Sequence, residues 1–374
     1  MTDSASVQTS NTGSRSDGTA TPTRWRGRRL KVALILIAAA LAVEGAARLQ
    51  QYLTMGSLPT YVPRHLIDFY RFYRVNPDYR TRTVRVNRAG FRNDEEITRD
   101  KPDNVVRVVM MGGSTVWGED DAGPLGTIDN RDTIAAHLET ILNERAAARG
   151  SKFRIQVINA GVVGYMLFQE EIYFSTYIAD FKPDLVIAMD GHNDLDALQF
   201  DLPLYHHRND STFDRELNRP LAFDLWRQFL RYAESKSMFV RKASSRITGW
   251  MNQLALSAWQ SKFEHPPQEA QIEGWLDAYG STVRRFDASA HIANAPILFT
   301  IQAEVAGESQ KLLTPAEAEM HDHTYVYYRW LHTTMRDRLI AKMRELKAQH
   351  GIWFEDVTGA FRTERQQAYI DYTH

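Results

Sequence analysis

The chain contains no cysteine among its 374 residues, and it carries almost no net charge, with a formal value of −1 at pH 7. The first absence excludes disulfides, a thiolate nucleophile and cysteine-ligated zinc. The second gives no reason to expect a polyanionic partner such as nucleic acid. Hydrophobic residues at 43% and charged residues at 24% are ordinary for a globular protein, and the length suffices for one large domain or two modest ones.

Long apolar runs are also absent, with one near-exception close to the N-terminus. Residues 32–43 are uninterruptedly apolar, which is fewer than the ~20 residues that a membrane span normally needs. A basic cluster precedes them, made of Arg24, Arg26, Arg28, Arg29 and Lys31. This order is typical of a segment inserted with its N-terminus in the cytoplasm. We therefore expect a disordered leader over 1–23 and a membrane anchor over 24–49, with the rest of the chain on the periplasmic or extracellular side. A cleaved signal segment and a buried core helix are the alternatives.

The remaining sequence alternates between expected strands and expected helices. A polar, aromatic connecting region with short strands covers 50–104, and Asn87–Gly90 reads as a turn within it. Apolar runs predict strands, and apolar residues at helical spacing predict helices. The expected strands are 105–111, 153–158, 185–189, 296–301 and 352–354, and the expected helices are 133–149 with Asp132 as N-cap, 168–178 and 325–349. This alternation predicts an α/β fold, a three-layer α/β/α sandwich with a central parallel sheet. A Trp-rich stretch, 200–290, is expected to be a helical insertion.

Polar side chains and glycines follow the first three strands. Gly112-Gly113-Ser114-Thr115 follows the first, Asn159 to Gly164 the second, and Gly191-His192-Asn193-Asp194 the third. Parallel sheets build their sites at this edge. A serine on a tight turn there can act as a nucleophile, while a glycine N–H and an asparagine amide can stabilise an oxyanion. The chain ends on Asp371-x-x-His374, in which the carboxylate can orient the imidazole that deprotonates a serine.

These four blocks resemble the SGNH (GDSL-type) hydrolase superfamily, in the family's order and over about residues 105–374. The resemblance implies a flavodoxin-like fold in which Ser114 is the nucleophile and His374 and Asp371 complete a triad. It implies that Ser114, Gly164 and Asn193 form the oxyanion hole. Gly113 departs from the family's usual aspartate, a version familiar in membrane-anchored bacterial members. Those members also carry an Asn-x-x-Gly-Phe-Arg segment, here residues 87–92, whose role the sequence does not give.

The predicted function is hydrolysis of a carboxylic ester, such as an acetyl ester of an envelope glycan or lipid, through an acyl-enzyme. An O-acyltransferase with the same triad and a catalytically inactive envelope binding protein are the alternatives. We expect neither metal nor organic cofactor: His321-Asp322-His323 and His206-His207 suit a solvated surface better than a metal site, and no Gly-Lys-Ser/Thr follows the glycines near 112. Because family members continue past their catalytic histidine, we expect the sequence to be truncated at its C-terminus.

Overall fold

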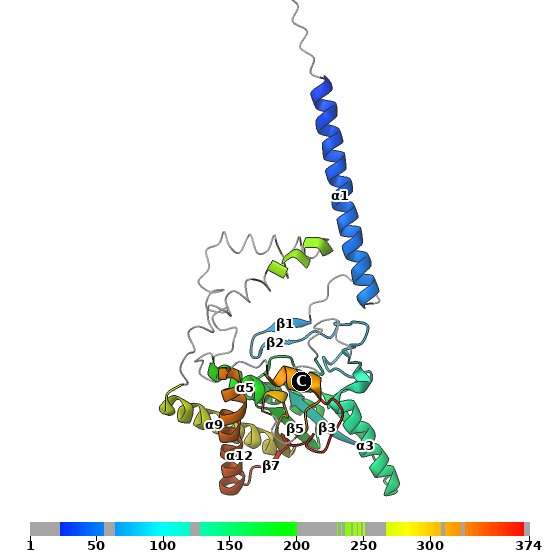
Figure 1. The fold of residues 1–374 in the computed structure, drawn as a ribbon. Helices are drawn as coiled ribbons and strands as arrows, with labels where there is room; N and C mark the ends of the chain where they lie inside the picture. Colours follow the sequence, from blue (N-terminus) through cyan, green and yellow to red (C-terminus); the bar gives the residue numbers. More distant parts are fainter. Residues whose placement is uncertain are drawn as a thin grey trace, which may run out of the picture.

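One apolar helix extends away from the central sheet (Figure 1), and its Glu44 accepts hydrogen bonds from the N–H groups of Met238 and Phe239. A computed structural model describes residues 23–55, 64–119, 128–199, 267–307, 311–322 and 326–369, with scattered positions between 230 and 250. Helix α1 covers Thr23–Met55, and its stretch Arg28–Gln50 has a mean hydropathy of 2.1 with none of it buried. That length and composition suit a membrane anchor or a signal sequence. The expected leader lies almost wholly outside the described residues.

The centre of the fold is a five-stranded parallel sheet in the order β4-β3-β5-β6-β7. The strands are β3 (Val105–Gly112), β4 (Arg154–Asn159), β5 (Leu185–Asp190), β6 (Ile297–Ile301) and β7 (Phe354–Asp356). All five predicted strands are confirmed, although the last begins later than expected. Ile352 is buried in the core, but pairing with β6 starts only where Phe299 faces Phe354. In chain order this sheet reads 2-1-3-4-5, so the strand order reverses between β3 and β5.

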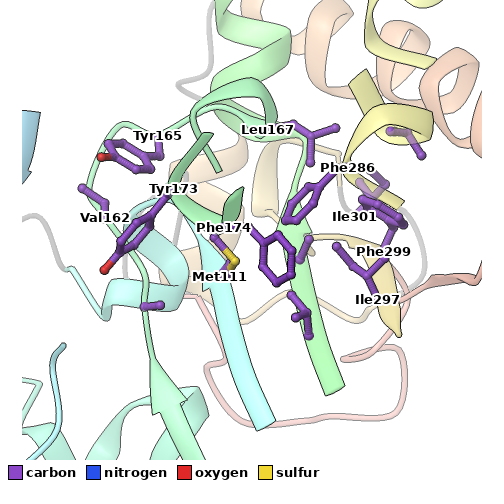
Figure 2. Close-up of a cluster of buried hydrophobic side chains, with 14 of the residues drawn as sticks. Met111, Val162, Tyr165, Leu167, Tyr173, Phe174, Phe286, Ile297, Phe299 and Ile301 are labelled. Atoms are coloured by element: carbon purple, nitrogen blue, oxygen red, sulfur yellow. The ribbon is translucent and has the colours of Figure 1, made fainter. Parts of the chain in front are cut away.

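Helices cover both faces of the sheet, which confirms the predicted α/β class. Helices α4 (Leu167–Thr176), α9 (Glu269–Ile292) and α12 (Arg336–His350) bury their apolar residues in the larger core cluster. Figure 2 shows part of this cluster, where Phe286 contacts both Phe174 and Phe299. Helix α3 (Ile134–Ala148) packs on the opposite face.

Two details of α3 differ from the sequence prediction. Its N-cap is Thr133, whose hydroxyl accepts a 3.3 Å hydrogen bond from the N–H of Ala136, and not Asp132. Ile134 and Ile141, expected on the core face, are 40% and 46% exposed. Leu138, expected on the same face as these two residues, does contact the sheet, and so does Ala135. The helix is therefore rotated relative to the face that its larger apolar residues suggest.

Two further segments depart from their expected form. Helix α9 carries buried Trp275, Tyr279 and Phe286 and belongs to the sandwich, so the helical insertion expected over 200–290 ends before it. The long helix expected over 325–349 consists of α11 (Val326–Trp330), a π-helical turn (Leu331–Met335) and α12. The described elements also include helix α10 (Pro315–Asp322) and 3-10 turns at Asn130–Asp132, Ile178–Phe181 and Val305–Gly307.

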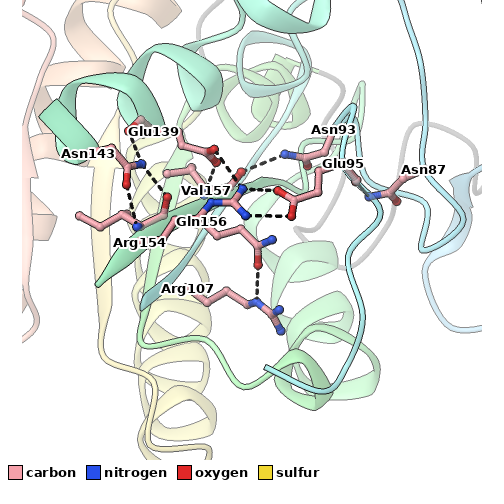
Figure 3. Close-up of polar contacts among 10 residues, drawn as sticks. Asn87, Asn93, Glu95, Arg107, Glu139, Asn143, Arg154, Gln156 and Val157 are labelled. Atoms are coloured by element: carbon pink, nitrogen blue, oxygen red, sulfur yellow. Dashed lines mark hydrogen bonds and ion pairs between the residues drawn. The ribbon is translucent and has the colours of Figure 1, made fainter. Parts of the chain in front are cut away.

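The connecting region is fastened to the sheet by polar contacts (Figure 3). Asn93 donates to the carbonyl of Val157 at 2.9 Å and accepts from the N–H of Asn159 at 2.9 Å, so it continues the hydrogen bonding of β4. Glu95 accepts hydrogen bonds from both terminal nitrogens of Arg154. Upstream, β1 (His65–Asp68) and β2 (Phe72–Val75) form an antiparallel hairpin. This region thereby reaches the carboxyl edge of the parallel sheet.

Candidate active site

Ser114 begins the short helix α2 (Ser114–Trp117), directly after β3. The serine is partly exposed, whereas Val116 and Trp117 in the same turn are buried. Asn193 is the second residue of helix α5 (His192–Gln199), which follows β5. Its side chain is also partly exposed. Since β3 and β5 are the neighbours between which the strand order reverses, both side chains lie at the switch point where open α/β sheets bind ligands.

Gly113 and Asn193 are in close contact. A Cβ at position 113 would lie 2.4 Å from Nδ2 of Asn193. That amide also donates a 2.7 Å hydrogen bond to the carbonyl of Tyr165, which restricts its movement. An aspartate at position 113 would therefore displace the amide, which gives a physical reason for glycine in this chain. The NH₂ group of Asn193 carries a second N–H that can serve a substrate oxygen.

The loop after β4 is held in place by two tyrosines. Gly164 has φ = +80°, and a Cβ there would lie 2.9 Å from the Tyr73 hydroxyl. That hydroxyl donates to the carbonyl of Val163 at 3.0 Å, and the Tyr165 hydroxyl donates back to the carbonyl of Tyr73 at 2.5 Å. Only glycine meets both the left-handed backbone and the close approach. The hairpin of the connecting region thus fixes the loop that carries Gly164.

Asn159 and Gly161 both contact α2. The Asn159 amide donates to the carbonyl of Val116 at 2.9 Å, and its oxygen accepts from the N–H of Gly161 at 3.1 Å. A Cβ on Gly161 would lie 2.4 Å from the backbone nitrogen of Trp117. The second sequence block therefore packs directly against the helix that begins with Ser114.

Arg92 contributes to the same helix and was not recognised from the sequence as part of the site. Its side chain is buried and donates to the carbonyls of Trp117 at 2.7 Å, Gly118 at 2.8 Å and Ile128 at 2.6 Å. The guanidinium also lies 5.3 Å from the centroid of the Trp117 ring. The contacts with Trp117 and Gly118 satisfy carbonyls at the end of α2 that have no partner within the helix. The Asn-x-x-Gly-Phe-Arg segment was the available signal, and this packing gives it a structural role.

Asp371 and His374 lie outside the described residues. The chain is anchored immediately before them. Tyr369 is buried, and its ring packs edge-on against Phe361. The backbone N–H groups of Ala368 and Tyr369 donate to one carboxylate oxygen of Glu317, at 2.8 and 3.2 Å.

Glu317 itself sits in a buried ion pair. Its second oxygen accepts from Lys311 Nζ and from the N–H of Thr314, both at 2.8 Å, and both charged side chains are fully buried. Burial favours the neutral acid, but the hydrogen bonds from Lys311 and the three backbone donors outweigh it and lower the pKa of Glu317 to about 2. The carboxylate therefore remains ionised and holds the segment that leads to Asp371.

Three buried carboxyl groups lie beneath the site. Burial raises the pKa of Asp190 to about 7, and it raises the pKa values of Glu170 and Asp194 well above their usual range. The nearby charge of Asp190 raises the pKa values of Glu170 and Asp194 further. Asp194 accepts a 3.2 Å hydrogen bond from the N–H of Leu167 at the start of α4. Asp194, the last residue of the third block, thus links α5 to α4.

His192, in the third block, faces a different cluster. Glu304 bridges His192 and His332, at 2.7 and 2.8 Å from their Nδ1 atoms. Burial opposes protonation of His332, but Glu304 and Asp196 outweigh it and raise its pKa to about 9. Of the histidines considered as ligands in the sequence, the structure describes only His321, whose ring lies 3.4 Å from Asp322 and whose carbonyl accepts a 2.8 Å hydrogen bond from Arg329. Positions 206, 207 and 323 lie outside the described residues.

The fold of this chain is similar to those of solved esterase and hydrolase structures, at low sequence identity. No protein-family model matches the chain, and no curated protein matches it significantly. Among solved structures, it is similar to a catalytic mutant of an acetylxylan esterase from Geobacillus stearothermophilus, with 16% identity, 74% of this chain and 89% of that chain covered, and a TM-score of 0.37. It is also similar to an α/β hydrolase enzyme from the metagenome of Lake Arreo, Spain, with 16% identity, 72% and 87% covered, and a TM-score of 0.35.

Proposed function

We propose that the protein is a serine esterase whose nucleophile is Ser114. The observation that carries this proposal is the convergence at one switch point of a partly exposed serine, the Asn193 amide and the Gly164 loop. An ordinary strand-to-helix turn would not need the buried guanidinium of Arg92 and the Asn159 amide to hold it. A rigid support of this kind is what a positioned catalytic group requires.

The proposed reaction proceeds through an acyl-enzyme. Ser114 Oγ attacks the ester carbonyl carbon while His374 accepts the hydroxyl proton, and Asp371 orients the imidazole. The N–H groups of Ser114 and Gly164 and the second N–H of Asn193 stabilise the tetrahedral oxyanion. His374 then protonates the leaving alcohol. Attack by water on the acyl-enzyme, again with His374 as base, releases the carboxylic acid and restores Ser114.

The proposed location is outside the cytoplasm, with α1 as the anchor. The basic residues that precede the apolar stretch support this orientation. An exported esterase of this kind would act on acyl esters of envelope glycans or lipids, with small acyl groups such as acetyl as the first candidates.

Hydrolysis of small acyl esters tests the proposal. We expect the full-length protein to release acetate from acetylated glycans or an aryl acetate, and Ser114→Ala to abolish release while Ser151→Ala, at an exposed serine remote from the site, retains it. Acetyl recovered on an added sugar in place of free acetate would indicate a transferase. A folded protein with no Ser114-dependent turnover on any acyl donor would favour the binding-protein alternative.

A further inference from the structure

Two buried histidines are oriented by a single carboxylate on the β6 side of the sheet edge. His192 opens α5, Glu304 follows β6, and His332 lies in the π-helical turn. The two imidazole rings stack with centroids 4.6 Å apart and planes 25° from parallel, and each Nδ1 faces a different oxygen of Glu304. With both Nδ1 atoms bonded to that carboxylate, both Nε2 atoms point to its opposite side.

A second carboxylate lies on that opposite side. Asp196, one helical turn after His192, places its oxygens 3.9 Å from Nε2 of His192 and 3.5 Å from Nε2 of His332. These distances exceed hydrogen-bond length. They are close to the ~3.4 Å that separates two ligands bound at ~2.1 Å to one tetrahedral ion. A modest shift of Asp196 would bring both pairs to that spacing.

The surroundings of the Nε2 atoms favour a bound cation. His332 is fully buried, and within the described part of the chain its Nε2 has no hydrogen-bond partner. Buried polar atoms are normally satisfied, whereas this atom has only the long 3.5 Å ion-pair contact with Asp196. The hydroxyl of Tyr328 forms a 3.3 Å hydrogen bond with Nε2 of His192, so a bound ion would displace this hydroxyl or take it as a further ligand. The π-helical turn that positions His332 is a rare conformation that occurs frequently at functional sites.

We propose that Nε2 of His192, Nε2 of His332 and the Asp196 carboxylate bind one divalent transition-metal ion, with Zn²⁺ as the best match. Two imidazoles and a carboxylate suit Zn²⁺ and its first-row neighbours, whereas Mg²⁺ and Ca²⁺ prefer oxygen ligands alone. Glu304 supplies the carboxylate that fixes both imidazoles, a common arrangement around metal-bound histidine. Because His192 immediately precedes Asn193, the ion would fix the start of α5 beside the candidate active site.

Zinc binding by the full-length, detergent-solubilised protein tests the site directly. After removal of metals by a chelator, titration with Zn²⁺ should show one equivalent bound. His332→Gln and Asp196→Asn should each weaken binding by about 100-fold, and Glu304→Gln by about 10-fold or more. His321→Gln, a partly exposed histidine on α10, is the matched control and should retain full affinity.

Spectroscopy of the unmodified protein keeps the test valid if a variant fails to fold. X-ray absorption of the Zn²⁺-loaded wild-type protein should give a shell of nitrogen and oxygen with two imidazoles. No binding by the folded wild-type protein would overturn the proposal, as would a shell without two imidazoles, or affinity unchanged in folded His332→Gln and Asp196→Asn. None of these readouts requires esterase activity, so the two proposals fail separately.

Discussion

The guanidinium of Arg92 donates a 2.7 Å hydrogen bond to the carbonyl of Trp117, the last residue of the helix that Ser114 begins. This hydrogen bond joins two residues that are 25 positions apart in the sequence, at the end of the helix that begins with the candidate nucleophile. The contact is one of several from the same buried side chain. It makes the orientation of Ser114 dependent on the connecting region.

Replacing Arg92 should therefore weaken both the fold and the site. Arg92→Lys keeps the charge but cannot reproduce the planar set of donors, and several carbonyls lose their partner. We expect a loss of about 2–4 kcal/mol in the free energy of unfolding, measured in urea, and a lower rate of Ser114-dependent turnover. The exposed Arg88 offers a control, since Arg88→Lys should change the free energy of unfolding by less than about 0.5 kcal/mol. Equal effects of the two substitutions would contradict the role given to Arg92.

Gly113→Ala should displace the Asn193 amide. The new methyl group would lie 2.4 Å from Nδ2, which is held by its bond to Tyr165. We expect kcat to fall by about 100-fold, the usual effect of losing one oxyanion donor, with little change in KM. Gly274→Ala on α9 is the control, because nothing lies within 4 Å of the added methyl, and it should leave turnover unchanged. An unaltered kcat in Gly113→Ala would show that the Asn193 amide does not stabilise the oxyanion.

Glu317→Gln should disturb the segment that leads to the proposed base. The substitution keeps the shape of the side chain but leaves Lys311 buried without its counter-charge, a change that costs about 3–5 kcal/mol. Turnover should also fall, because the N–H groups of Ala368 and Tyr369 lose the carboxylate that accepts their hydrogen bonds. Glu319→Gln, at an exposed position of the same helix, should have little effect on either. A stable Glu317→Gln variant with normal turnover would show that this anchor is dispensable.

The same carboxylate predicts a pH dependence of stability. The pKa of Glu317 is lowered from 4.5 to about 2 in the folded protein, so the unfolded chain takes up the proton first as the pH falls. The stabilisation is complete above about pH 4.5 and disappears between about pH 4.5 and 2, with a total of about 3 kcal/mol. Urea unfolding at several pH values should show the wild-type protein and Glu317→Gln converging in acid. A constant difference between them across this interval would contradict the assignment.

Much of the fold could be predicted because its signals are local. Apolar runs such as Val105–Met111, which only Arg107 interrupts, identify buried strands, and the glycines and polar residues after them identify the sheet edge. Helix α9 was expected to belong to the insertion because its buried aromatics continue a Trp-rich stretch in which no strand was expected. The face of α3 was misjudged because residue size favoured Ile134 and Ile141 over Ala135, while the packing favours the smaller side chain.

Long-range contacts explain what the sequence could not give. Arg92 meets Trp117 only after the chain folds, and His192 and Glu304 are 112 residues apart. The π-helical turn that aims His332 leaves no trace in the apolar periodicity of the helix around it. The proposed roles of Ser114, Gly164, Asn193, Asp371 and His374 remain predictions.

The topology of α1 is testable by fusion. A reporter active only outside the cytoplasm, joined after Met55, should give a signal, while the same reporter joined before Arg24 should be silent. Retention of the mature protein in washed membranes would identify an anchor, and release would identify a cleaved signal segment. A signal from the cytoplasm at Met55 would refute export.

Fluorophosphonate labelling followed by peptide mass spectrometry tests the central claim most directly, because such probes phosphonylate only an activated serine. We expect the adduct of the full-length protein on Ser114, its loss in Ser114→Ala, its strong reduction in His374→Ala, and its persistence in Ser151→Ala. A folded protein that stays unlabelled, or one labelled at another serine, would contradict the assignment of Ser114 as the nucleophile.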